Sequence, residues 1–132
     1  MTEVVFYKLT GYWVHIVKDG LLDVDALPDE EAPYGWVKFT PLSPKVIYAG
    51  DPSTAYTVGS VEADIVKGVL TDLQGREGIY LASSIGGIPI QWQAKTHLEF
   101  AGHKIPFPTI EFTVESDSQI AELLPATEGE QS

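Results

Sequence analysis

Two stretches in the last third of the chain decide the fold: IPIQWQA at residues 88–94 and IEFTV at residues 110–114. Apolar and polar side chains alternate in both stretches. Ile88, Ile90 and Trp92 thus share one face of the first stretch, together with the alanine that ends it. A period of two gives an extended strand one dry face and one wet face. Each stretch therefore predicts a half-buried β-strand.

Strands are expected along the rest of the chain as well, at residues 36–40, 61–65 and 79–82 among others. Turn residues separate these strands about every 8 to 15 residues, and no long helical pattern interrupts them. Apolar residues just before Pro125 predict one short helical turn. The sequence therefore predicts an all-β fold with a helical turn near the C-terminus. The candidate architectures are an immunoglobulin-like sandwich, a transthyretin-like sandwich and a partly open barrel.

The length of 132 residues indicates one β-sandwich domain, which we place at residues 1–125, followed by a polar C-terminal tail at residues 126–132. The chain has no cysteine, so neither a disulfide nor a thiolate metal site is expected. The residues after Met1 do not form a signal peptide, and no segment has the apolar length of a membrane span. We therefore expect no membrane association.

The chain carries a net charge of −11, from 19 acidic and 8 basic residues. Such a chain would repel phosphate backbones, so nucleic acid is not an expected partner. The acidity favours solubility, and it leaves a basic partner or a divalent cation as alternatives. The acidic stretch at residues 19–31 offers oxygen ligands suited to Ca²⁺. It does not fit an EF-hand, however, because Pro28 stands where that loop requires glycine.

No catalytic motif of a known hydrolase or nucleotide-binding enzyme occurs in the sequence. His97 and His103 flank an expected hairpin, so they could approach each other and hold a metal or act as a base. Solvated histidines are much commoner, and a chain this acidic supplies carboxylate pairs by chance. We therefore expect a protein that is not an enzyme and has no cofactor and no bound metal.

The first candidate contact surface is the stretch Ile105, Pro106, Phe107 and Pro108. Two prolines within an apolar run are incompatible with a central strand, because each removes a backbone donor from the ladder. The sequence therefore predicts an edge strand or an extended arm here. An apolar arm of this kind is a candidate assembly contact with a neighbouring subunit.

The second candidate surface is formed by Tyr34 and Trp36, which follow a charged, proline-rich loop. Most aromatic side chains in alternating strands belong to the core. These two are the exception, because their position after the loop favours a place at a rim. They are the candidate ligand rim, where a sugar ring could stack.

Several strand and turn motifs also resemble a known family. The chain is similar to a tail-associated β-sandwich domain of minor tail proteins from phages that infect actinobacteria. The similarity spans most of residues 9–125. The matching segments are residues 9–11, 35–41 and 68–81, the strand around Trp92, and residues 110–114 and 121–125.

The resemblance implies a non-enzymatic virion structural protein, a minor tail component at the tail or tail tip. Its partners would be other virion proteins and further copies of itself, in a trimer or ring. It would be made in the host cytoplasm and end in the virion. The alternatives are a module that binds host-surface polysaccharide or serves adhesion, and a decoration protein on the head surface. The resemblance brings no catalytic residues.

Overall fold

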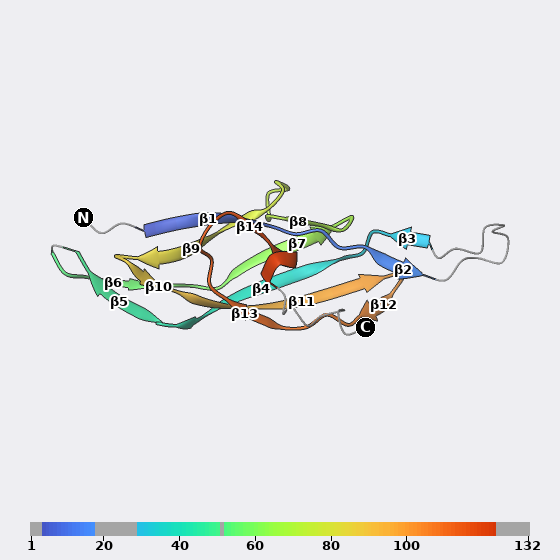
Figure 1. The fold of residues 1–132 in the computed structure, drawn as a ribbon. Coiled ribbons are helices and arrows are strands. Elements are labelled where there is room, and N and C mark those ends of the chain that lie inside the picture. The colour runs from blue at the N-terminus through green and yellow to red at the C-terminus, as the bar shows by residue number, and fades with distance from the viewer. Residues whose placement is uncertain (1–3, 18–28, 51, 124–132) are drawn as a thin grey trace.

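The computed structural model describes residues 4–17, 29–50 and 52–123. These residues form an all-β sandwich with a single short 3-10 turn at Ile120–Leu123, as the sequence predicted (Figure 1). The expected polar tail at residues 126–132 and most of the acidic stretch at residues 19–31 lie outside the described residues.

The larger sheet has six strands and provides one layer of the sandwich. Its centre is the long antiparallel pair of β4 (Tyr34–Ser43) and β11 (Gln91–Phe100), which stay in register over most of their lengths. The chain enters this layer three times, first at residues 34–43, then at residues 61–71 and last at residues 91–112. Its strands are β12 (His103–Ile105), β11 (Gln91–Phe100), β4 (Tyr34–Ser43), β7 (Val61–Val66) and β8 (Val69–Thr71) in spatial order, with β13 (Ile110–Phe112) also paired to β11.

The smaller sheet has four strands and provides the other layer. Its strands are β10 (Ile88–Pro89), β9 (Ile79–Ile85), β1 (Val4–Thr10) and β14 (Ser118–Gln119) in spatial order. Two short ribbons project from the ends of the sandwich (Figure 1). They are formed by β2 (His15–Val17) with β3 (Asp29–Glu31), and by β5 (Val46–Ala49) with β6 (Thr54–Thr57).

The core lies between the inner faces of the two sheets. Trp92 and Phe39 are its largest fully buried side chains. The indole N–H of Trp92 donates to the carbonyl oxygen of Ala82 at 2.8 Å, which joins the larger sheet to β9 of the smaller one. Phe39 packs edge to face on Phe112, with ring centroids 6.3 Å apart. Period-two burial on these strands is what the alternating sequence predicted.

Ile88 departs from the predicted apolar face. It lies in β10 of the smaller sheet and is 42% exposed, whereas Ile90 and Trp92 are buried. The reason is a tight turn at Gly86-Gly87, which pairs Ile88 back onto Ile85. The chain then crosses to the larger sheet, so the alternation in residues 88–94 spans two sheets and not one strand.

Candidate functional site

The outer face of the larger sheet carries the predicted ligand rim. Tyr34 is 47% exposed and Trp36 is 44% exposed. Trp36 lies between His97 of β11 on one side and Asp64 of β7 on the other. The His97 ring stacks on the indole, with centroids 5.4 Å apart and planes 14° apart. The aromatic exposure expected from the sequence is therefore present in the fold.

A groove of about 390 Å³ lies on the β7 side of Trp36. Lys38, Glu62 and Asp64 line it with the indole, so an aromatic wall stands beside one ammonium and two carboxylate groups. On the opposite side, the His97 Nε2 lies 3.2 Å from a carboxylate oxygen of Glu99. An exposed indole with hydrogen-bonding groups around it is able to hold a sugar ring by stacking and by polar contacts.

Gly35 determines how closely β4 approaches β11 beneath this face. A Cβ atom at Gly35 would lie 1.8 Å from the carbonyl oxygen of His97, which is a backbone atom and cannot rotate away. Only glycine allows this approach. The stacking of Trp36 on His97 therefore depends on the glycine between the two rim residues.

The predicted arm at residues 105–108 is used largely within the molecule. Ile105 ends β12, an edge strand, and packs with Phe107 against the core. Phe107 meets Trp13 edge to face, with ring centroids 6.1 Å apart. Pro106 and Pro108 remain exposed. The edge position of this segment agrees with the sequence prediction. Its side chains Ile105 and Phe107 face the core, however, so the outer surface is formed by the two prolines.

The two histidines that could have formed a site do not converge. His103 lies opposite Phe100 in the β11–β12 hairpin, so these two residues share one face. His97 is three residues before Phe100 and therefore points to the other face of the sheet. Among the residues that the structure describes, no group of three or more His, Cys, Asp or Glu is arranged to hold a metal ion.

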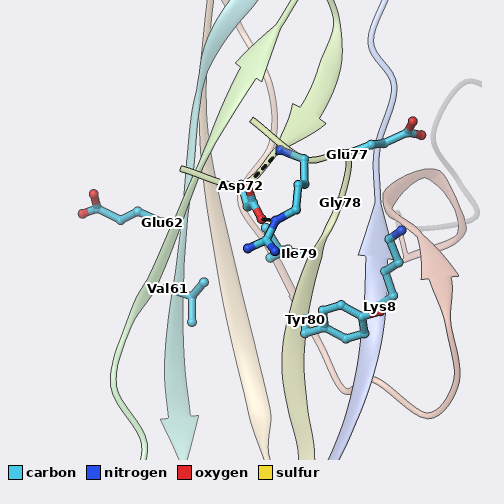
Figure 2. A pocket seen from close by; sticks show the side chains of 9 residues that line it. Lys8, Val61, Glu62, Asp72, Glu77, Gly78, Ile79 and Tyr80 are labelled. Carbon is cyan, nitrogen blue, oxygen red and sulfur yellow. Dashed lines mark hydrogen bonds and ion pairs between the residues drawn. The ribbon is translucent and has the colours of Figure 1, made fainter. Parts of the chain in front are cut away.

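A cleft that the sequence did not predict lies between β7 and β9. It has a volume of about 520 Å³. Val61 lies on one wall and Ile79 and Tyr80 lie on the other, while the side chain of Glu62, next to Val61, points away from them (Figure 2). One wall belongs to the larger sheet and the other to the smaller sheet. They come together only because strands that are distant in the sequence pair within each sheet. The sequence signal that marks one end of the cleft is the turn at residues 72–78, where the chain crosses between the sheets.

Asp72 organises this turn. Its Oδ1 accepts the backbone N–H groups of Gln74 and Arg76, both at 2.9 Å, and its Oδ2 accepts the Arg76 Nε–H at 2.8 Å. The backbone N–H of Arg76 is the main cause that lowers the pKa of the Asp72 carboxyl below its ordinary value. The Gln74 N–H and the Arg76 guanidinium act in the same direction, while partial desolvation opposes them.

The other end of the turn is tied to the N-terminal half of the chain. The Tyr12 hydroxyl donates a hydrogen bond to the Glu77 carboxylate, which raises the pKa of the tyrosine. Gly78 follows with a positive φ, and a Cβ there would lie 2.8 Å from the Lys8 side chain. The chain therefore packs closely against β1 where it leaves the turn.

Fold and surfaces together define an all-β sandwich with an aromatic outer face and a cleft between strand edges. Comparisons with protein-family models, with curated proteins and with solved structures found no match. Within the described ranges, no helix reaches the length and apolarity needed to cross a membrane.

Proposed function

We propose that the chain is a non-enzymatic structural protein of a phage virion, a minor tail component at the tail or tail tip. In this role it is made in the host cytoplasm and assembles with other tail proteins and with copies of itself. The proposal is supported by the resemblance of the strand and turn motifs, together with the all-β sandwich that they imply. A rigid sandwich with exposed apolar side chains suits repeated contacts in an assembly.

The exposed surface that favours assembly is the β5–β6 ribbon at one end of the molecule (Figure 1). Tyr48 is 72% exposed, and Val46 on the same face is also exposed, whereas Ile47 between them is buried. Ala55 lies opposite Tyr48 and extends this apolar face. Large apolar groups gathered on a projecting ribbon are typical of a protein contact.

The proposal is tested by two measurements on the intact chain. Mass spectrometry of purified mature particles should detect the chain, and sedimentation should show self-association. Tyr48→Ser should reduce both. Leu73→Ser is the matched control, because Leu73 is also largely exposed but lies in the turn beside the cleft. A monomeric chain that is absent from mature particles would contradict the proposal.

Binding of host-surface polysaccharide is the second candidate function, and the Trp36 groove favours it. We propose that a sugar ring stacks on the indole face beside Asp64 and Glu62. An array of bacterial surface oligosaccharides should show binding that Trp36→Ala abolishes. Tyr80→Ala is the control, since Tyr80 is also an exposed aromatic residue but lies on the other sheet. Binding that survives Trp36→Ala would remove this candidate.

A further inference from the structure

The first wall of the cleft is β9, and its backbone at Tyr80 faces the cleft. Alternate residues of a strand direct their N–H and C=O groups to opposite edges. The Gly78 N–H donates to the Leu70 carbonyl at 2.8 Å, and the Ala82 carbonyl accepts the indole N–H of Trp92 at 2.8 Å. Positions 78 and 82 therefore face away from β1. Tyr80, midway between them, faces the same way, and no strand in the described part of the chain pairs with it there.

The second wall is β7, where the backbone of Glu62 also faces the cleft without a paired strand among the residues described. Leu70 of β8 donates its N–H to the Gly11 carbonyl at 2.9 Å, so its backbone faces away from β7. Its partner Ile65 must then bond to β4. Asp64 and Glu62 consequently face the other edge of β7. Asp64 meets β8, but Glu62 lies beyond the pairing with β8 and has no strand beside it among the residues described.

The floor of the cleft is apolar and incompletely covered. Val61 lies in register with Phe39, which is fully buried, yet Val61 itself is only half-buried. The difference arises because Phe39 has a neighbouring strand on each side, whereas Val61 has one on one side only among the residues that the structure describes. A strand added beside Val61 would place an inward side chain over it and over Ile79.

The charge around the cleft defines the outward side chains of such a strand. Asp72 and Arg76 form an ion pair and compensate each other. Glu62 and Glu77 remain against Lys8, so the lining has a net negative charge, as does the whole chain at −11. Opposite charges on neighbouring strands stabilise a sheet, and like charges destabilise it.

We propose that this cleft accepts an extended segment of a partner polypeptide as an added strand. The segment bonds to the backbone of Glu62 and lies beside that of Tyr80. It places one apolar side chain inward over Val61 and a lysine or arginine outward beside Glu62. Each wall offers one residue whose backbone has no paired strand among the residues described. A segment of about three residues is therefore enough to fill the cleft. The inference does not depend on the proposed place in a virion.

The test uses blocked, fluorescein-labelled peptides and the unaltered protein. Lys-Val-Lys-Val-Lys should bind in fluorescence anisotropy, and Glu-Val-Glu-Val-Glu should bind at least about tenfold more weakly. Lys-Val-Pro-Val-Lys should bind weakly too, because proline lacks the N–H that an added strand donates. In amide NMR spectra, the signals of Glu62 and Tyr80 should shift most on addition of the basic peptide.

A charge reversal checks the assigned position. Glu62→Lys should invert the preference between the basic and acidic peptides, whereas Glu111→Lys, an equal change on β13, should leave it unaltered. The proposal is overturned if no peptide binds at concentrations of about 1 mM, if charge and proline make no difference, or if the shifted signals surround Trp36 and not the cleft. None of these outcomes bears on whether the chain occurs in virions.

Discussion

The strand edges are covered to different extents on the two long sides of the sandwich. On one side, here called the closed side, β12 and β13 pair with the two ends of β11, and residues 106–109 connect them across a hollow of about 550 Å³ beside Lys95 and Thr96. On the other, the open side, β8 covers only part of β7 and β10 only part of β9. The cleft with Glu62 and Tyr80 lies in the gap that remains.

The comparison shows how a chain can shield a strand edge from solvent without pairing another strand to it. On the closed side, Phe107 turns inward onto Trp13 and the exposed prolines present no N–H group to solvent. On the open side, the described residues provide no equivalent segment. A partner strand would therefore cover the strand edges on the open side, as residues 106–109 cover the edge of β11 on the closed side.

The largest predicted effect concerns the centre of the larger sheet, on which both sides depend. Gly35→Ala should destabilise the protein by about 4 kcal/mol, because the new Cβ meets the His97 carbonyl and forces β4 from β11. Gly59→Ala is the matched control, since a Cβ there meets no atom within 4 Å. Urea unfolding of both variants measures the difference. Equal stabilities would contradict the close approach of the two strands.

The next effect tests the cover on the closed side. Phe107→Ala should cost about 2 kcal/mol of unfolding free energy, because it removes a half-buried ring from the Trp13 contact. Thr109→Ala, an exposed change in the same segment, should have little effect. Thermal unfolding compares the two variants. If both are neutral, the segment does not serve as the cover of this edge.

A smaller effect concerns the turn at the end of the open side and depends on pH. The pKa of Asp72 is lowered in the folded protein, so its stabilising effect is present above the ordinary value of 3.8. That effect is lost as the pH falls through the lower folded pKa. Asp72→Asn should therefore be less stable than the unaltered protein near neutrality, and the difference should shrink as the pH falls below 3.8. A difference that grows on acidification would have the wrong sign.

The smallest effect on stability is expected at the outer face. Trp36→Ala should change the unfolding free energy by only about 0.5 kcal/mol, because the indole is exposed and loses mainly its stacking on His97. The measurement is urea unfolding beside Trp92→Ala, in which a fully buried indole is removed. Similar losses in the two variants would mean that Trp36 belongs to the core.

The sequence predicted what depends on local alternation. The strand β13, shorter than the expected 110–114 because it ends at Phe112, the exposure of Trp36 and the helical turn near residue 120 all follow from patterns a few residues long. The sequence also placed residues 105–108 at an edge, because proline excludes a central strand. These features need no knowledge of which strands become neighbours.

Features that depend on the pairing of distant strands could not be predicted in this way. Whether His97 and His103 meet is decided by the register of β11 with β12, and Ile88 leaves its expected face because a hairpin returns it to β9. The cleft is the clearest case. Glu62 and Tyr80 are distant in sequence, and nothing near either residue shows that its backbone lacks a neighbouring strand.

Amide hydrogen exchange of the free protein tests the difference between the two sides most directly. We predict that the amides of Glu62 and Tyr80 exchange about a hundredfold faster than those of Ala63 and Leu81, whose N–H groups face β4 and β1. Equal protection at all four positions would contradict the open edge and, with it, the proposed strand-binding cleft.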